Sequence, residues 1–599
     1  MKMRVADFIV QHLRNIGVDT VFLLNGGGMM HMVDALARCE GIRYVCSHHE
    51  QASAIAADAY ARLSGKLGVC YATAGPGATN ILTGVVGAWQ DSSPALFITG
   101  QSKSTQTIAL SGIKGLRQFG TFEVNTVPIM ESVTKYSHML TDASTIKYHL
   151  EKAIHEATSG RPGPVLLDIP LDIQGALIDP ETLQGFVDEE PAAALAPTEN
   201  EIQQIITAVS GAKRPVILAG VGVRVANASE AFRKLIEEWQ IPVVTTQLGK
   251  DAMYYEHPLF VGHSGPKGDR AGNFAVQTAD VILSLGTSLH GQTTGWENKL
   301  FAPTATKIQI DLDDAVLERE QINVNLKVRA GVAEFIECIK PFITPHASEK
   351  WRACCHSWKT RYPVHAEPHQ HEEDGANFYD FAEILSQLLP DNACVVSDAG
   401  SAFYVAGQAI RLKDGQRFIS SGSLGAMGYA LPAANGCSLF DRNRPIVCVT
   451  GDGSLMTNVH ELATMRMEQR NVKLFVINNS GYVSMRNTHR EFFQGLIVGA
   501  DYESGVFIPA MESLAKSYEL PYLCCKTDEE IRHTIREALE MDGPVLVEVI
   551  TMKNQRIIPT VASKRLPDGR MVSTPIHEMQ PALPDDVIAK EMSAAISED

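Results

Sequence analysis

Two polar residues, Asp452 and Asn479, stand directly after two apolar runs of the chain. The run RPIVCVT and Gly451 come before Asp452, VKLFVIN comes before Asn479, and both runs predict buried parallel strands. Residues 457–470 between them predict a helix. A right-handed strand–helix–strand unit brings both side chains to the carboxyl ends of the strands, where open α/β sheets bind ligands. Because a carboxylate and an amide oxygen suit Mg²⁺, we expect a site there for a metal ion and phosphate groups.

The same run contains a GDG triplet and an NN pair, with 27 positions from Asp452 to Asn479 (479 − 452). This pattern resembles the signature of the thiamine diphosphate enzymes. The resemblance implies that Asp452, Asn479 and the backbone carbonyl of Gly481 bind Mg²⁺, and that the metal holds the diphosphate of the cofactor. The resemblance also implies that neighbouring residues border the cofactor, namely Gly453, Ser454 and Tyr482. From the residues alone, an ordinary turn with an Asp cap and an Asn-rich loop stays the alternative.

Glu50 is the candidate for proton transfer. The segment IRYVCSHHEQASAIAADAYARLSGK predicts a strand over residues 42–47 and an Ala-rich helix that begins near Glu50. From position alone, Glu50 is equally well a first-turn acid that complements the helix dipole. The segment resembles the family motif HEQxAAxxADGYAR, which implies that Glu50 hydrogen-bonds the aminopyrimidine ring and relays its proton. In relatives this Glu and the diphosphate site come from different subunits, so we expect a homodimer or homotetramer with active sites at the subunit interface.

A Gly-rich turn, ATAGPGATN at residues 72–80, follows the strand-like run VCYAT and opens a predicted helix. Gly75 allows the close backbone approach that a flat ligand requires. A lone Gly-Pro-Gly is a weak signal, but the run resembles the family's TSGPGATN. The resemblance implies that Pro76 and Asn80 border the aminopyrimidine ring or the reaction cavity.

A second Gly-rich segment, SSGSLGAMGYALPAANG at residues 420–436, resembles the family segment SGGLGTMGFALPAA. The resemblance implies that Met427 wedges between the two rings of the cofactor and that the Gly425 carbonyl holds its amine. Ser401 and Ala402, within SDAGSAFY, are expected to contact the diphosphate. A Met that only fills a gap in the core is the alternative.

Strand-like runs alternate with helical patterns along the whole chain, which predicts the α/β class with three doubly wound parallel sheets. Residues 178–200 and 343–375 lose this periodicity and predict interdomain linkers. The runs TAGPGATN and TGDGSLMTN suggest that the first and third sheets are related. Three such domains resemble the architecture of the enzymes similar to acetohydroxyacid synthase. The expected parts are a pyrimidine-binding domain (1–178), a central Rossmann-like domain (195–342), a diphosphate- and Mg²⁺-binding domain (376–555) and a tail or lid (556–599).

Composition excludes several classes of protein. At 599 residues, with 45% apolar and 20% charged residues, the chain predicts several full hydrophobic cores. A formal net charge of −17 argues against nucleic acid or an anionic membrane as partner. No apolar run is long enough to cross a bilayer, and the N-terminus lacks the apolar core of a signal peptide. Eleven scattered cysteines without paired metal spacings favour a reducing, cytoplasmic location.

The central domain leaves a second cofactor open. Its runs LAGVGVR and LSLGTSLHGQTTGW predict a Rossmann-like fold and no more. In the synthases that this chain resembles, the domain carries a non-redox FAD, bound partly through an Arg and acids after the second strand. The run GHSGPKGDRAGNFAVQ, with Arg270, retains some of that resemblance, whereas LHGQTTG departs from it. The sequence therefore leaves two alternatives for the central domain, one with bound FAD and one without it.

Two substrate elements depart from authentic acetohydroxyacid synthases, which share an FQE triplet and a GMVxQWQ run. The triplet position has Phe122 between Thr and Glu, and the second run reads SGYVSMRNTHREFFQG. The latter is closer to acetolactate-synthase-like proteins that move an acetyl unit from pyruvate to a keto-sugar. Phe122, Arg486, His489 and Arg490 are therefore expected to line a polar substrate site. A solvated helix start is the alternative.

The expected reaction is carboligation: a 2-oxo acid, pyruvate by preference, loses CO₂ and its acyl unit is joined to a carbonyl acceptor such as a keto-sugar. The alternatives are an acetolactate synthase of branched-chain amino acid synthesis, a decarboxylase, lyase or C–C hydrolase with the same cofactor, and a silent binding protein of the same fold. The C-terminal run RLPDGRMVSTPIHEMQPALPDD predicts either a lid over the site or a packing tail.

Overall fold

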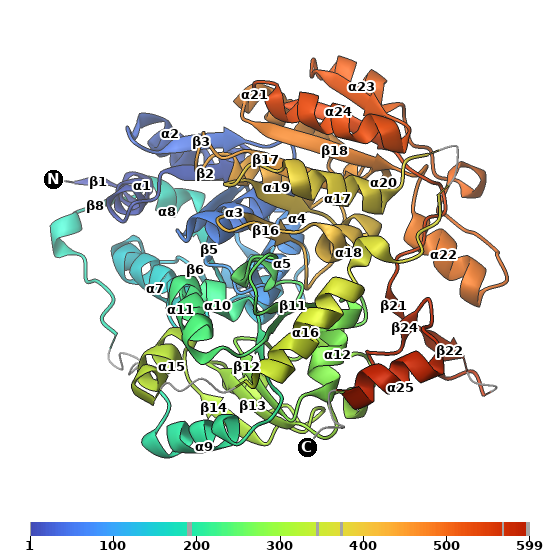
Figure 1. Ribbon diagram of the computed structural model, residues 1–599. Coiled ribbons are helices and arrows are strands. Elements are labelled where there is room, and N and C mark those ends of the chain that lie inside the picture. Colours follow the sequence, from blue (N-terminus) through green and yellow to red (C-terminus); the bar gives the residue numbers. More distant parts are fainter. Residues whose placement is uncertain (1, 189–194, 343–346, 372–374, 566–567, 595–599) are drawn as a thin grey trace.

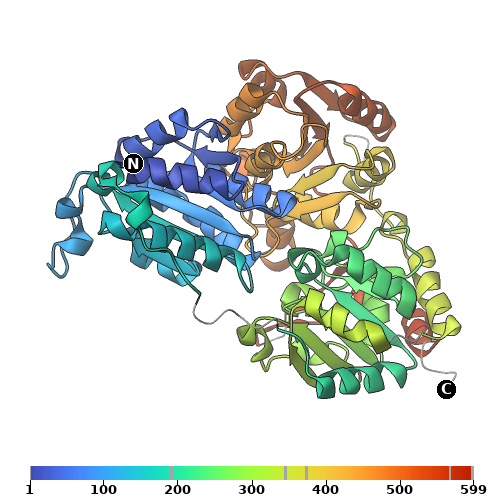
Figure 2. The ribbon, with the colours of Figure 1, turned by 90° about the vertical axis from the view of Figure 1, so that its left-hand side faces the viewer.

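The computed structural model describes residues 2–188, 195–342, 347–371, 375–565 and 568–594. Three six-stranded sheets, all of them parallel, form the framework, and helices cover both faces of each (Figure 1). The α/β class with three doubly wound sheets is thereby confirmed. Figure 2 separates the three units, with the N-terminal sheet in blue, the middle one in green and the C-terminal one in orange.

The N-terminal sheet has the strand order β3-β2-β4-β5-β7-β6. Its strands are β2 (Thr20–Leu23), β3 (Arg43–Cys46), β4 (Gly68–Ala72), β5 (Ala95–Gln101), β6 (Tyr136–Met139) and β7 (Pro164–Pro170). The helices around it include α1 (Val5–Asn15), α2 (Met30–Arg38), α3 (Glu50–Ser64), the short α4 (Pro76–Asn80), α5 (Leu82–Gln90) and α7 (Ile146–Thr158). Continuous apolar runs such as ALFIT form these strands because both faces of the sheet are buried.

The C-terminal sheet has the order β16-β15-β17-β18-β20-β19. Its strands are β15 (Cys394–Ser397), β16 (Arg417–Ser420), β17 (Ile446–Gly451), β18 (Val472–Asn478), β19 (Tyr522–Cys525) and β20 (Val545–Ile550). Its helices include α17 (Phe378–Leu388), α18 (Gly400–Ala409), α19 (Ala430–Cys437), α20 (Asp452–Leu455), α21 (Leu462–Glu468), α22 (Val483–Phe492) and α24 (Asp528–Glu540). In both terminal sheets the chain order is second, first, third, fourth, sixth, fifth, which agrees with the suggestion that they are related.

The middle sheet has a different order, β11-β10-β9-β12-β13-β14, which is that of the Rossmann fold. Its strands are β9 (Pro215–Ala219), β10 (Val243–Thr245), β11 (Phe260–His263), β12 (Val281–Leu285), β13 (Thr306–Asp311) and β14 (Leu326–Arg329). Its helices include α9 (Glu199–Ser210), α11 (Ser229–Trp239), α12 (Arg270–Thr278) and α15 (Val332–Ile339). The strand order reverses between β9 and β12, and this switch point is where such sheets bind ligands.

The two terminal sheets are joined by direct packing of α3 on α19. Both helices are rich in small residues, so their backbones approach closely: a Cβ added to Gly436 would lie 2.3 Å from the carbonyl oxygen of Ala56. Buried polar pairs fix the contact, with the Tyr429 hydroxyl donating to Asp58 Oδ2 (2.9 Å). The start of α3, which contains Glu50, is thereby held by the C-terminal domain.

The expected helix over residues 457–470 is shorter in the structure. The chain forms α20 at Asp452–Leu455, and only Leu462–Glu468 forms α21. Asn458 has non-helical angles and donates its side-chain N–H to the carbonyl oxygen of Gly428 (2.8 Å), and Val459–Glu461 then forms a 3₁₀ helix that leads into α21. A tertiary contact therefore coincides with the late start of the helix.

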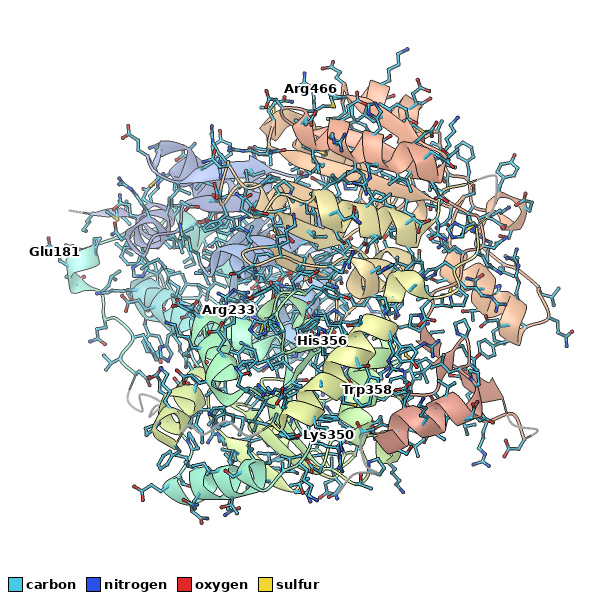
Figure 3. The ribbon with its side chains drawn as sticks, in the orientation of Figure 1. Glu181, Arg233, Lys350, His356, Trp358 and Arg466 are labelled. Carbon is cyan, nitrogen blue, oxygen red and sulfur yellow. The ribbon has the colours of Figure 1, made fainter. Side chains whose placement is uncertain are left out.

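The expected linker over residues 343–375 is wrong in its middle part, because Glu349–Arg361 forms a helix, α16. Its buried residues Trp351, Cys355 and Trp358 stand at helical spacing and join the core of the middle domain. Trp351 also donates its indole N–H to the carbonyl oxygen of Pro215 (2.9 Å). Figure 3 shows Trp358 on this helix.

The tail packs on the middle domain. Strand β21 (Thr560–Val561) pairs with β24 (Met579–Gln580), β22 (Ser563–Arg565) pairs with β23 (Met571–Ser573), and α25 spans Asp585–Ala594. Ile576 and Met579 are buried in the middle-domain core. The tail therefore packs on the middle domain through these two residues, and its use as a lid stays a prediction.

Candidate active site

Strands β17 and β18 bring Asp452 and Asn479 together. They are neighbours in the sheet, and Gly451 at the end of β17 pairs with Ile477 near the end of β18. Asp452 and Asn479 follow at the same edge, and both are buried. This edge lies beside the switch point between β15 and β17. The sheet order therefore places both residues at one edge of the sheet, and their joint binding of a metal ion stays a prediction.

The Asp452 carboxylate accepts two backbone N–H groups, and no Lys, Arg or His among the described residues forms an ion pair with it. Oδ1 accepts the N–H of Gly453 and Oδ2 that of Gly481, each at 2.8 Å. Burial raises the pKa of Asp452 to about 6, and these two N–H groups oppose the rise. A buried carboxylate beside an amide side chain and a tight backbone loop is a donor set that fits Mg²⁺.

The loop after β18 requires unusual backbone angles. Ser480 and Gly481 have φ values of 61° and 122°, and a Cβ on Gly481 would lie 2.3 Å from the carbonyl oxygen of Ala500. Only glycine fits at position 481. The ring of Tyr482 packs on Gly453, where an added Cβ would lie 2.4 Å from it. The predicted cofactor residues Gly453 and Tyr482 therefore lie in contact beside Asp452.

Ser454 links this turn to the Met427 segment, because its hydroxyl accepts the N–H of Gly428 (2.9 Å). Met427 itself is 43% exposed, although the residues after it are buried. Gly425 has φ 68° and no atom within 4 Å of an added Cβ. An exposed Met between two glycines of positive φ, Gly425 and Gly428, is available to a ligand, so filling the core of this chain does not explain it.

Ser401 and Ala402 lie in the first turn of α18, which begins at Gly400 (φ 61°) directly after β15. Asp398, two residues before Gly400, was not among the site residues expected from the sequence. It is fully buried, accepts the Thr450 hydroxyl (2.5 Å), and has a pKa raised to about 6 by burial. Asp398 therefore braces β15 against β17 at the switch point; its place directly after a strand was the signal.

Glu50 begins α3 and is 6% exposed. Its Oε2 accepts the side-chain N–H of Asn80 (3.0 Å), and a Cβ on Gly77 would lie 3.3 Å from Oε1. Pro76 begins the short helix α4, and a Cβ on the preceding Gly75 would lie 2.2 Å from the carbonyl oxygen of Phe122. Glu50, Pro76 and Asn80 thus lie around one glycine turn, and their contact with a cofactor ring stays a prediction.

The Glu50 group and the Asp452 group are separate. No hydrogen bond or ion pair within the described residues joins Glu50 or Asn80 to Asp452 or Asn479. One group follows strands of the N-terminal sheet and the other follows strands of the C-terminal sheet. A ligand that contacts both groups therefore has to bridge two sheets.

The four expected substrate residues do not form one site. Arg486 is fully buried, and its guanidinium binds backbone carbonyls, so its expected contact with substrate is wrong. His489 accepts the N–H of Val498 through Nδ1 (3.3 Å), and Arg490 is exposed. Phe122 is 81% exposed with φ 57°, and its backbone touches the Gly75 turn. Arg486 was misassigned because its position one turn into a polar helix resembles an exposed one.

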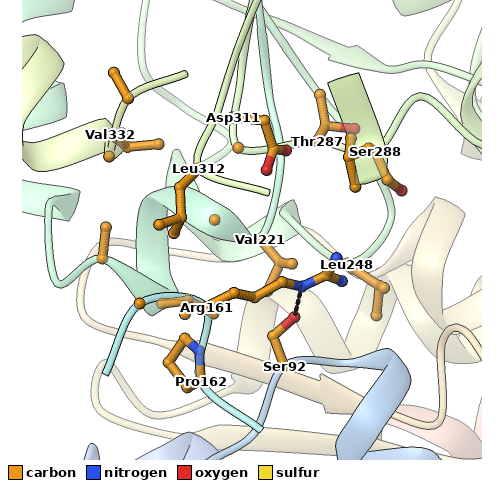
Figure 4. Close-up of a pocket in the computed structure, with 18 of the residues that line it drawn as sticks. Ser92, Arg161, Pro162, Val221, Leu248, Thr287, Ser288, Asp311, Leu312 and Val332 are labelled. Atoms are coloured by element: carbon orange, nitrogen blue, oxygen red, sulfur yellow. Dashed lines mark hydrogen bonds between the residues drawn. The ribbon is translucent and has the colours of Figure 1, made fainter. Parts of the chain in front are cut away.

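A cavity of about 330 Å³ lies where the three domains meet and continues into a second of about 770 Å³. Figure 4 shows Arg161 crossing it, with Nε donating to the Ser92 hydroxyl (2.8 Å). The cavity is lined by the turns after β9 and β12, which include Gly222 and Gly286, and by Asp311 at the end of β13. Arg270 does not reach it, because its guanidinium binds the Glu367 carboxylate (2.6 and 2.9 Å) beneath the tail.

Comparison with known proteins agrees with this geometry. Family models for the thiamine pyrophosphate enzymes match all three units: the N-terminal TPP binding domain at residues 3–118, the central domain at 202–339 and the C-terminal TPP binding domain at 398–549. The chain belongs to the thiamine pyrophosphate enzyme family. The two matches named for TPP binding cover the two related sheets that contain the Glu50 and Asp452 groups.

Individual relatives indicate which members of the family this chain resembles. The chain is 31% identical over 585 residues to the chloroplastic acetolactate synthase of Arabidopsis thaliana, which covers 93% of this chain and 83% of that protein. It is 30% identical to the acetolactate synthase isozyme 1 large subunit of Escherichia coli, over 93% of this chain and 95% of that protein. It is 31% identical to the acetolactate synthase large subunit of Parasynechococcus marenigrum, over 95% of this chain and 91% of that protein. This thiamine diphosphate-dependent chain is therefore an acetolactate synthase-like transferase. No helix among the described residues is long and apolar enough to span a membrane.

Proposed function

We propose that this chain is a Mg²⁺- and thiamine diphosphate-dependent carboligase that decarboxylates pyruvate and joins the two-carbon unit to a second 2-oxo acid. The observation that carries the proposal is the shared edge of β17 and β18, where Asp452 and Asn479 converge beside the Gly481 loop. The relatives are named acetolactate synthases, which favours a 2-oxo acid as acceptor. Neither the comparisons nor the position of Arg486 supports a keto-sugar acceptor.

The proposed roles follow the geometry. Asp452, Asn479 and the Gly481 carbonyl would hold Mg²⁺, which neutralises a diphosphate. Ser401 and Ala402, in the first turn of α18, would donate their N–H groups to that diphosphate. When bound, thiamine diphosphate supplies the nucleophilic carbon and the electron sink of the reaction. The remaining cofactor residues, which would shape the ring pocket, are Gly425, Met427, Gly453, Ser454 and Tyr482.

Glu50 would hold a proton for the aminopyrimidine ring. Asn80 fixes Oε2 by one hydrogen bond, and Gly77 leaves room for a flat ring against Oε1. Burial of Glu50 excludes water, so a proton on its carboxyl passes to a bound ligand rather than to solvent. Asn80 therefore orients the carboxyl, and Gly75 and Pro76 close the turn beneath the ring.

We also propose a homodimer, or a homotetramer built from such dimers, with two chains contributing to each active site. The support is that no hydrogen bond or ion pair of the described residues joins the Glu50 group to the Asp452 group. Large apolar side chains are also exposed at the Gly75 turn, in the Gly-rich segment and after α22, namely Phe122, Met427, Phe493 and Leu496. A second copy would cover them and bring one chain's Glu50 to the other's Asp452.

The cavity between the three domains is the proposed position for FAD, if this chain binds it. The strand order of the middle sheet and the glycine turns at Gly222 and Gly286 favour a dinucleotide. Arg161, which also binds Asp313 (2.6 Å), is a cation that lines this cavity, whereas Arg270 does not reach it. An absorption spectrum of the purified protein tests for flavin.

Product analysis tests the proposed reaction. The protein is incubated with thiamine diphosphate, Mg²⁺ and pyruvate, with and without a second carbonyl compound, and CO₂ and products are measured by mass spectrometry. Acetolactate from pyruvate alone supports the proposal. CO₂ release that no acceptor changes, with acetaldehyde as product, would show a decarboxylase, and no turnover of any 2-oxo acid would show a silent binding protein.

The cytoplasmic location stays a prediction, supported by eleven cysteines that are all free thiols.

A further inference from the structure

Arg486 is a buried cation in the wall of the metal loop, here defined as residues 479–481. Its Nη2 donates to the carbonyl oxygen of Asn479 (2.7 Å), and its Nη1 donates to those of Ser480 and Ala500 (each 3.1 Å). Nη2 also donates to the carbonyl oxygen of Lys553 and lies 3.4 Å from Asn479 Oδ1. One side chain therefore ties together three stretches that are remote in sequence.

No acidic partner among the described residues forms an ion pair with Arg486, although it is fully buried. Burying a charge is costly unless hydrogen bonds replace its lost water. Here backbone carbonyls supply these bonds, and a planar guanidinium with five N–H donors suits several acceptors at once. Because burying this charge costs free energy, we infer that Arg486 serves to position the backbone groups that it binds.

The carbonyls that Arg486 holds determine where the other groups of the metal loop point. With the Asn479 and Ser480 carbonyls turned toward Arg486, the Gly481 N–H is turned toward Asp452 Oδ2 (2.8 Å). Ser480 keeps a φ of 61°, which a residue with a side chain rarely adopts without outside support. An added Cβ on Gly481 would also lie 3.2 Å from Nη1 of Arg486, so the two are in close contact.

We propose that Arg486 is a positioning residue for the metal loop, which it holds ready-formed so that the Asn479 amide and the Gly481 carbonyl match the narrow geometry of Mg²⁺. The inference rests on the proposed function, because it presupposes the metal site. Mg²⁺ demands near-ideal octahedral coordination, whereas Ca²⁺ accepts irregular ligand sets. Loss of the guanidinium therefore weakens binding of Mg²⁺ more than binding of Ca²⁺.

The test is a calorimetric titration of Mg²⁺ and of Ca²⁺ into the full-length protein with thiamine diphosphate present. Arg486→Lys keeps the charge but cannot bind four carbonyls. We expect its Kd for Mg²⁺ to rise about tenfold or more, as for other outer groups that orient metal ligands, with a smaller rise for Ca²⁺. Arg466→Lys is the matched control: Arg466 lies on the surface, as Figure 3 shows, and pairs with Glu519.

A change in stability alone does not imitate this result, because it would shift the affinities for the two cations equally. Equal shifts, or none, in a folded Arg486→Lys protein would overturn the inference. Wild-type protein that takes up neither cation with thiamine diphosphate would instead overturn the proposed function itself.

A second measurement needs no variant and applies even if Arg486→Lys fails to fold. Hydrogen exchange of the wild-type protein reports whether the loop is formed without metal. A protected Gly481 N–H before and after addition of Mg²⁺ and thiamine diphosphate supports Arg486 as the element that positions the loop. A Gly481 N–H that becomes protected only after addition would show that the metal orders the loop, and would refute the inference.

Discussion

Replacing Glu50 by Gln separates proton transfer from every other function of this residue. The two side chains have the same shape, and the Gln amide oxygen still accepts the N–H of Asn80, which lies 3.0 Å from Oε2. The amide N–H₂ takes the place of Oε1, where Gly77 leaves space. We expect the free energy of unfolding to change by less than about 1 kcal/mol, because no buried hydrogen bond is lost.

Catalysis is expected to change far more. A positioned acid or base typically contributes about 10²- to 10⁴-fold to a rate. At about 1.4 kcal/mol per tenfold, this corresponds to about 3 to 5 kcal/mol in the activation barrier. The assay is kcat for pyruvate consumption at saturating thiamine diphosphate and Mg²⁺, with cofactor affinity measured separately by calorimetry.

Glu461→Gln is the matched control, because Glu461 is an equally buried carboxylate with a structural environment. It accepts the N–H of His48 (2.8 Å) and the hydroxyl of Thr464 (2.6 Å). We expect this variant to lower the melting temperature and to leave kcat within about threefold, because it changes only hydrogen bonds that support the fold. A Glu50→Gln enzyme that retains wild-type kcat would refute the proton-transfer role.

Three further predictions concern titratable and buried groups. Burial raises the pKa of Asp452 to about 6, so below that pH Mg²⁺ must displace a proton from this carboxyl. The affinity for Mg²⁺, measured by calorimetry, should therefore weaken by up to about tenfold per pH unit below 6. A constant affinity from pH 7 to 5 would contradict this. Burial lowers the pKa of Lys250 to about 7, so the folded state binds fewer protons than the unfolded state above pH 7, and stability should rise toward pH 10 by up to about 1.4 kcal/mol per unit. Denaturant unfolding should show a flatter slope for Lys250→Met; an unchanged slope would rule out this contribution. Hydrogen bonds from Arg361 and Trp358 lower the pKa of Glu591 to about 2. The contribution of Glu591 to stability is therefore complete above pH 4.5 and is lost as the pH falls toward 2. Glu591→Gln should speed proteolysis of the tail at pH 7, and unaltered cleavage would argue against its anchoring role.

The parts of the fold that local pattern determines were predictable. Apolar runs bounded by Gly marked the strands β17 and β18, and their right-handed connection placed Asp452 and Asn479 at one edge. The Ala-rich α3 begins at Glu50, as expected for a helix opened by an acid after a strand. Periodicity and handedness suffice here because neighbouring segments of chain interact with each other.

Features set by distant segments were not predictable. The helix expected over residues 457–470 starts only after Asn458, which binds Gly428, 30 positions away, and its first turn is a 3₁₀ helix. The polar helix α22 gives no local sign that Arg486 points inward, since the carbonyls that it binds belong partly to Ala500 and Lys553. The helix α16 was hidden because charged residues surround its buried Trp351 and Trp358. In each example a partner remote in sequence supplies the deciding contact.

The central claim is that the Asp452 edge and the Glu50 turn together bind one cofactor through a metal ion. Calorimetric titration of thiamine diphosphate into the protein, with Mg²⁺ and again with a chelator, tests it most directly. We predict uptake of one molecule per chain in the presence of Mg²⁺, loss of uptake with the chelator, and loss of uptake in Asp452→Ala. Absence of binding in the presence of Mg²⁺, or equal binding by Asp452→Ala, would contradict the claim.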